Sequence, residues 1–202
     1  MLIEHILKES VENIAVFYGG RFQPMHQGHS DVYKHLCSKF GADNVFIATT
    51  FSQKAIKAHS SKDFSSDPFT FDEKASIMNK MFNILGDKIV NANPYRPDVS
   101  KIGRDPTKTA LVLVYGEKDA DRLATGTGFL HKMPENMDEL VPTANERGYV
   151  YVAPLMQGGM SASSFREVMS GDTEEDEQKK SFIQFFGKFD PKVFGFIKDR
   201  LK

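Results

Sequence analysis

The sequence predicts an α/β fold, in which a parallel sheet of about five strands carries helices on both faces and further helices follow at the C-terminus. Two observations predict it. Short apolar runs of strand length alternate with amphipathic helical patterns, as in parallel sheets. The chain has 202 residues, of which 40% are hydrophobic, enough to bury one core. We expect a single domain over residues 1–202, with a core over about 13–170 and a helical tail over about 172–202.

Five apolar segments have the length and composition of buried strands. They are rich in β-branched or aromatic residues, and most are bounded by turn-forming residues. Helical patterns separate several of them, so parallel pairing is expected. The expected strands cover residues 14–18, 45–50, 88–92, 111–115 and 149–153.

Helices are predicted where apolar side chains recur on one face. One helix follows the first strand, and a short one is expected over residues 2–11. Another opens with a capping box of Thr70 and Glu73 and should run to about Leu85. Its expected buried face consists of Ile77, Met78, Met81, Phe82 and Leu85. The polar segment 51–66 and the poorly periodic segment 125–147 are expected to be loops.

A glycine-rich turn with two histidines, residues 19–29, links the first strand to the next helix. Glycine allows the backbone to approach a ligand closely, and a helix N-terminus offers free N–H groups and the positive end of a dipole. The turn therefore predicts a phosphate site. In a parallel sheet such a turn lies beyond the carboxyl ends of the strands, where ligands bind.

Three motifs in this sequence resemble a known superfamily. His26-Gln27-Gly28-His29 matches the His-x-Gly-His signature of nucleotidyltransferases, and the longer form from Gly20 to His29 is similar to archaeal-type nicotinamide mononucleotide adenylyltransferases. Residues 160–166 match a Ser-rich turn before an arginine, and residues 67–74 resemble an Asn-Pro-Phe-Thr segment of the same enzymes. The three occur in the expected order over roughly 13–170, and the resemblance implies a Rossmann-like sheet.

The resemblance also implies a reaction and its residues. A phosphate oxygen of a small monoester would attack the α-phosphorus of a nucleoside triphosphate and release pyrophosphate, with catalysis by positioning and charge stabilisation. The implied catalytic residues are His26, His29, Arg166 and Lys54. ATP is the expected substrate, with Mg²⁺ bound through the triphosphate and no protein metal ligand. The implied nucleotide-binding residues are Gly19, Gly20, Arg21, Phe22, Gln23, Gly28, Asp119, Ser161 and Ser163.

Several of these roles have plainer alternatives. Lys54 lies in a polar segment that is either a solvated loop or a loop closing over substrate. Asp119 is either a sugar or base contact or part of an acidic helix start. Arg104 and Lys108 could reach a phosphate or only water. Nicotinamide mononucleotide is the leading acceptor, although the chain lacks tryptophan. Cytidylyl transfer, phosphopantetheine adenylyl transfer and a catalytically silent structural subunit remain alternatives.

Composition limits the partners. The net charge of −1 gives no basic field for nucleic acid, and we expect none to bind. The N-terminal residues do not predict a signal peptide, and apolar runs are too short to span a membrane. A single cysteine fits a reducing compartment, so a cytoplasmic protein is expected. The N-terminal stripe and the aromatic C-terminal tail would pack on this chain's own core or contact another copy or an assembly partner.

Overall fold

The computed structural model describes residues 11–61, 66–116, 128–154, 156 and 160–201. In these ranges six strands form one sheet in the order β3-β2-β1-β4-β6-β5, and every neighbouring pair is parallel. The strands are β1 Asn13–Gly19, β2 Val45–Thr49, β3 Ile89–Asn91, β4 Thr109–Tyr115, β5 Leu130–Lys132 and β6 Gly148–Val152. The predicted α/β class is confirmed, and each expected strand is present.

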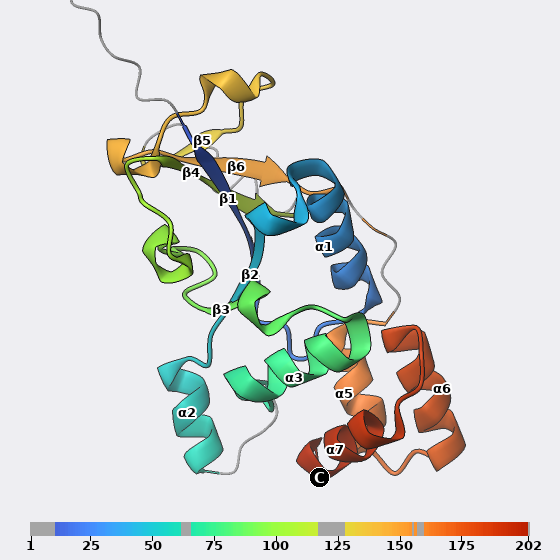
Figure 1. Ribbon diagram of the computed structural model, residues 1–202. Coiled ribbons are helices and arrows are strands. Elements are labelled where there is room, and N and C mark those ends of the chain that lie inside the picture. Colours follow the sequence, from blue (N-terminus) through green and yellow to red (C-terminus); the bar gives the residue numbers. More distant parts are fainter. Residues whose placement is uncertain (1–10, 62–65, 117–127, 155, 157–159, 202) are drawn as a thin grey trace, which may run out of the picture.

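The sheet buries both of its faces. On β1 the side chains of Val16 and Tyr18 face one cluster, and those of Ala15 and Phe17 face the other, as the period of two requires. Helix α1 (Gln27–Phe40) covers the first face with a stripe that includes Leu36. The 3₁₀ helix η3 (Val99–Ile102) covers the second face, and Figure 1 shows the two on opposite sides of the sheet.

Helix α3 (Phe71–Phe82) begins as predicted, with a capping box between Thr70 and Glu73. It ends earlier than expected, because Asn83 adopts the left-handed conformation that closes the helix. Leu85 was expected to be buried, and that expectation was wrong. Its side chain is 61% exposed, while Ile84 is buried in its place.

Two segments expected to be loops contain regular structure. Helix α2 (Gln53–Ser60) occupies the polar segment after β2, where Ser52 Oγ accepts the N–H of Ala55 at 3.1 Å. Strand β5 lies within the segment 125–147 and pairs with β6 on one side only. Both were missed for the same reason: a short element with few buried side chains leaves no apolar period to detect.

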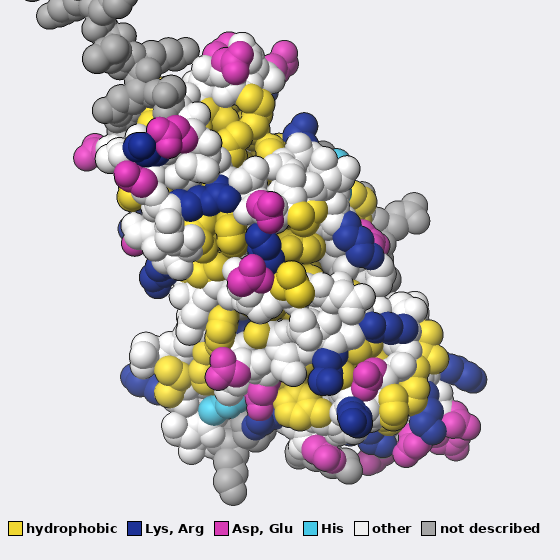
Figure 2. Space-filling model, in the orientation of Figure 1, with side chains coloured by type: hydrophobic (Ala, Val, Ile, Leu, Met, Phe, Trp, Pro, Cys, Tyr) yellow, Lys and Arg dark blue, Asp and Glu magenta, His cyan; other side chains and the backbone are white. Residues whose placement is uncertain are grey.

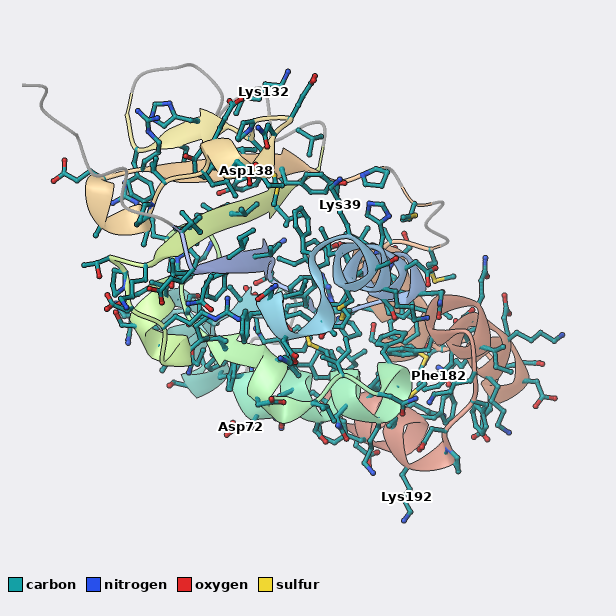
Figure 3. The ribbon with its side chains drawn as sticks, turned by 45° about the horizontal axis from the view of Figure 1, so that its top comes forward. Lys39, Asp72, Lys132, Asp138, Phe182 and Lys192 are labelled. Carbon is teal, nitrogen blue, oxygen red and sulfur yellow. The ribbon has the colours of Figure 1, made fainter. Side chains whose placement is uncertain are left out.

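Three helices build a second cluster beside the sheet: α5 (Ala162–Ser170), α6 (Glu175–Phe186) and α7 (Pro191–Leu201). Figure 1 shows them packed together next to α3, and an ion pair between Arg200 and Glu73 joins α7 to α3. In Figure 3 Phe182 lies among these helices, whereas Lys192 projects away from them. The aromatic tail therefore fills an internal core. Contact with another copy stays a prediction, and the expected N-terminal helix lies outside the described residues.

The surface carries mixed charge. Figure 2 shows basic and acidic side chains interspersed over one face of the molecule. Among the helices that the structure describes, none has the length and apolarity needed to cross a bilayer.

Candidate functional site

The first motif lies where β1, at the centre of the sheet, runs into α1. The chain must turn sharply here, and Phe22 takes a left-handed φ of 47°, which a residue with a side chain rarely adopts. The ring of Phe22 packs edge-on against Tyr18 at 5.4 Å and against His29 at 5.2 Å between ring centroids. This packing holds the strained turn in place and buries one side of the histidine motif.

Gly19 and Gly20 are required by the protein itself. A Cβ at Gly19 would collide with the carbonyl oxygen of Pro94, and one at Gly20 would lie 2.7 Å from the ring of Phe22. The expected role of these glycines, close approach to a ligand, stays a prediction. In this structure the absence of a side chain lets the segment at Pro94 and the ring of Phe22 pack against the turn. Gly28 is buried in the first turn of α1.

His26 and His29 form a reciprocal cap at the start of α1. Nδ1 of His26 accepts the N–H of His29 at 3.3 Å, and Nδ1 of His29 accepts the N–H of His26 at 3.4 Å. A nitrogen that accepts a hydrogen bond carries no proton, so each neutral ring must hold its proton on Nε2. Both imidazoles are thereby fixed as Nε2–H donors at a helix N-terminus.

The two rings are stacked, with centroids 3.7 Å apart and an angle of 25° between their planes. Burial lowers the pKa of His29 to about 3, and the neighbouring charge of His26 acts in the same direction. Burial also lowers the pKa of His26. Both rings are therefore neutral at pH 7, and they act as hydrogen-bond donors without a permanent charge.

The second motif meets the first through Arg166 on α5. Its Nη1 donates to the backbone carbonyl oxygen of Gln23 at 2.6 Å, and its Nη2 donates to Ser163 Oγ at 3.4 Å. Ser161 caps the helix by accepting the N–H of Ser164 at 3.1 Å. The hydrogen bond to Gln23 therefore brings helix α5 against the turn that carries the first motif.

Arg166 has a second guanidinium near it. Burial is the main cause that lowers the pKa of Arg166, and the positive charge of Arg21 lowers it further, while Asp67 opposes both. Arg21 is largely exposed and lies 4.0 Å from Asp67. Glu167 also opposes the lowering, so two carboxylates lie near these two guanidinium groups. The arginines therefore supply charged N–H donors of the kind that bind phosphate oxygens, without a net excess of positive charge among these four side chains.

The side chain of Gln23 is already engaged. Its Nε2 donates to the carbonyl oxygen of Phe69 at 3.0 Å, and its Oε1 accepts the N–H of Phe69 at 2.9 Å. This pair joins the first motif to the segment before α3, and it satisfies both ends of a buried amide. The nucleotide-binding role expected of Gln23 stays a prediction, and in this structure its amide holds the motif to Phe69.

One predicted site residue is not brought into this group, and another cannot be placed. Lys54 lies in the first turn of α2, where its side chain is exposed and makes no hydrogen bond or ion pair with any residue the structure describes. Asp119 lies outside the described residues. Arg104 is engaged elsewhere: it donates to the carbonyl oxygens of Ile14 and Asp43, at the amino ends of β1 and β2, far from the histidines along those strands.

Sequence reasoning missed Lys74. Its ammonium is buried and donates to Thr49 Oγ1 at 2.7 Å, to the Thr50 carbonyl at 2.9 Å and to the Arg21 carbonyl at 3.2 Å. Burial lowers its pKa to about 8. Lys74 thus ties the end of β2 to the histidine-bearing turn. The signal was available, because Lys74 falls in the apolar stripe of α3 with Ile77.

Within the described part of the chain, no three His, Cys, Asp or Glu side chains lie together in a way that could hold a metal ion. The groups gathered at the turn are N–H donors and guanidinium groups, a set suited to phosphate oxygens rather than to a cation.

The fold and the site together define an α/β protein with a glycine-rich turn and two histidines at the centre of a parallel sheet. The chain belongs to the cytidylyltransferase-like family, whose model matches residues 17–168. The expected membership of the nucleotidyltransferase superfamily is thereby confirmed; the archaeal-type detail stays a prediction.

Two solved structures share this fold at low sequence identity. One is a bifunctional NMN adenylyltransferase/ADP ribose pyrophosphatase from Francisella tularensis, with a TM-score of 0.53 and 18% identity over 93% of this chain. The chain spans 49% of that protein. The other is the Plasmodium falciparum nicotinic acid mononucleotide adenylyltransferase complexed with NaAD, with a TM-score of 0.52, 11% identity and coverage of 93% and 95% of the two chains. No curated protein sequence matches the chain.

Proposed function

We propose that this protein transfers AMP from ATP to a small phosphate monoester, such as nicotinamide mononucleotide, and releases pyrophosphate. One observation carries the proposal: the stacked pair of His26 and His29 presents Nε2–H donors from a helix N-terminus whose preceding turn is held by Arg166. The family membership and the names of the two similar structures support it.

In the proposed reaction a phosphate oxygen of the acceptor forms a bond to the α-phosphorus of ATP. The bond from that phosphorus to the bridging oxygen of pyrophosphate breaks, and the electron pair leaves with pyrophosphate. Negative charge on the non-bridging oxygens would be stabilised by hydrogen bonds from Nε2–H of His26 and His29 and by the N-terminus of α1. The neutral state of both rings suits this role, since donation needs no prior protonation.

Arg166 would hold the β- and γ-phosphates as a fork of charged donors, with Arg21 close enough to add positive charge. Ser161 and Ser163 lie at the same helix start. A Mg²⁺ ion would be held by triphosphate oxygens and would supply charge neutralisation of the leaving pyrophosphate. Contributions of Lys54, Asp119, Phe22 and the glycines to binding remain part of this proposal.

The experiment is incubation of the purified chain with ATP or CTP and a panel of acceptors, scored by pyrophosphate release. The panel contains nicotinamide mononucleotide, nicotinic acid mononucleotide, phosphopantetheine and phosphocholine. Release only with ATP and a mononucleotide supports the proposal. Release only with CTP would move the activity to cytidylyl transfer, and release with phosphopantetheine would change the acceptor. Tight triphosphate binding without release from any pair would favour the silent subunit.

A further inference from the structure

The C-terminal helix α6 lies outside the family-matched residues 17–168, yet it contacts the first motif. The ring of Phe185 packs edge-on against the ring of His26, with centroids 5.5 Å apart and planes at 77°. Phe185 is 1% exposed, so its position is fixed on all sides. We propose that Phe185 is a positioning residue, which fixes the imidazole of His26 relative to Arg166 and so makes the C-terminal helices part of the phosphate site.

A continuous series of ring contacts joins the two motifs. His29 stacks on His26, His26 contacts Phe185, and Phe185 stacks on Phe165 with centroids 4.0 Å apart and planes at 15°. Phe165 directly precedes Arg166, whose guanidinium returns to the first motif at the Gln23 carbonyl. The spacing between imidazole and guanidinium is therefore set from two sides, by a backbone hydrogen bond and by a stack of rigid rings.

The end of α6 also approaches the start of α1 closely. Gly187 closes α6 with a left-handed φ of 78°, and a Cβ there would lie 2.7 Å from Oε1 of Gln27, the residue after His26. A side chain at this position would displace the amide end of the Gln27 side chain. The contact between Phe185 and His26 thus belongs to a wider approach between the end of α6 and the start of α1.

The contact with Phe185 restrains rotation of the His26 imidazole. The hydrogen bond to Nδ1 of His26 is long, and rotation of an imidazole about its last side-chain bond occupies a broad energy well. Stacking on His29 restrains the ring from one face, and the edge contact with Phe185 restrains it further. A donor that must meet a developing charge gains from such preorganisation, because it loses no energy in reorienting during the reaction.

The plain alternative is that Phe185 is only a core residue. Phe182 provides the matched control: it lies one turn earlier on α6, is fully buried, and packs against Phe165, Phe186 and Phe194. Among the described residues its ring contacts are with phenylalanines and not with a histidine. Phe182→Leu therefore removes the same number of atoms from the same cluster and leaves the contact with His26 intact.

The test compares Phe185→Leu and Phe182→Leu in the full chain. The kinetic part rests on the proposed function. We expect both variants to lower the melting temperature by similar amounts, because each removes a buried ring. We expect Phe185→Leu to lower kcat about tenfold with a smaller change in KM for ATP, and Phe182→Leu to leave kcat within about twofold. Phe185→Met serves as a second variant if the leucine variant folds poorly, because the unbranched methionine side chain can adapt to the gap that the ring leaves.

A second measurement does not depend on turnover. The ¹⁵N resonances of the histidine rings distinguish an acceptor Nδ1 from a protonated one. In the parent protein and in Phe182→Leu, His26 should hold its proton on Nε2 alone. In Phe185→Leu we expect a mixture of the two tautomers or exchange broadening. If the parent protein released no pyrophosphate, the proposed function would fail, and these resonances would still decide the positioning role.

Two outcomes would overturn the proposal. One is an unchanged kcat and an unchanged His26 tautomer in Phe185→Leu. The other is an equal loss of kcat in both variants in proportion to their loss of stability, which would make Phe185 an ordinary member of the core.

Discussion

Nη1 of Arg166 donates a hydrogen bond of 2.6 Å to the backbone carbonyl oxygen of Gln23, a residue 143 positions earlier in the chain. The bond joins the turn before α1 to the middle of α5 and so brings the two motifs together. Nη1 of the guanidinium is thus engaged by a backbone carbonyl, and Nη2 donates to Ser163 Oγ at the longer distance of 3.4 Å. These two hydrogen bonds orient the guanidinium group of Arg166 before any phosphate binds.

Replacing Arg166 by lysine tests this orientation. A lysine keeps the charge but offers a point donor instead of a planar fork, so it cannot hold the Gln23 carbonyl and a phosphate with the same geometry. We expect ATP affinity to fall about tenfold, measured by calorimetry. Arg147→Lys makes the same change at an exposed position and should leave affinity unaltered. Equal affinities in both variants would remove Arg166 from the site.

His29→Gln separates capping from catalysis. Glutamine is a usual residue at the third position of a helix, where its side-chain oxygen can accept the N–H of the cap residue, as Nδ1 of His29 does here. The variant should keep the start of α1 and lose the Nε2–H donor. We expect kcat to fall about 100-fold while the circular dichroism spectrum stays that of the parent. His29→Ala, which also empties a packed site, should lose more stability than His29→Gln.

The lowered pKa of His29 predicts a loss of stability in mild acid. Below about pH 6.5 the unfolded chain binds a proton at this residue, whereas the folded chain does not until about pH 3. The unfolded state then holds more protons, so the free energy of unfolding should fall as the pH falls. The expected slope is about 1.4 kcal/mol per pH unit for one such group.

Urea unfolding between pH 6.5 and 5.0 measures that slope before carboxylates titrate. The lowered pKa of His26 acts in the same direction. His29→Gln should show a shallower dependence than the parent. A parent whose stability is constant over this range would contradict the burial of both rings as neutral groups.

Lys74→Met tests the buried ammonium beneath the turn. Methionine fills much of the same space but leaves the carbonyl oxygens of Arg21 and Thr50 without this donor. We expect the free energy of unfolding to fall by about 1–3 kcal/mol in chemical denaturation. Lys80→Met, on the exposed side of the same helix, is the control and should change stability little. A Lys74 variant as stable as its control would show that water or the backbone replaces the ammonium without cost.

Gly19→Ala tests the close approach at the end of β1. The added methyl group would meet the carbonyl oxygen of Pro94, so the two segments must move apart. We expect a loss of about 1–3 kcal/mol, together with lower activity, because the histidine turn follows directly. Gly86→Ala adds the same methyl group where nothing lies within 4 Å, and it should be neutral or mildly stabilising.

The sheet was predictable because its strands are buried on both faces and therefore appear in the sequence as short, unbroken apolar runs. The start of α3 was predictable from the capping box at Thr70, and its end was not, because a left-handed Asn83 turns the chain without any change in hydrophobic pattern. Strand β5 and helix α2 bury too few side chains to produce a period.

The candidate site also has a part that the sequence predicts and a part that it does not. The residues of the two motifs could be named from the sequence, because each is a local pattern of strand, turn and helix start. Their long-range supports could not. The amide of Gln23 bonded to Phe69 and the ring of Phe185 against His26 depend on segments far apart in the chain, and nothing local marks them. Lys74 was the exception, since a charge within an apolar stripe is visible without a structure.

The position of β1 has a consequence for how the chain is made. β1 pairs with β2 on one side and with β4 on the other, where Asn13 lies opposite Thr109. The strand is therefore synthesised well before one of its two partners. Arg166 and Phe185 are synthesised later still. Pairing across such separations slows folding. A nascent chain would therefore hold β1, the glycine turn and both histidines early, and would complete the candidate site only after helices α5 and α6 have emerged.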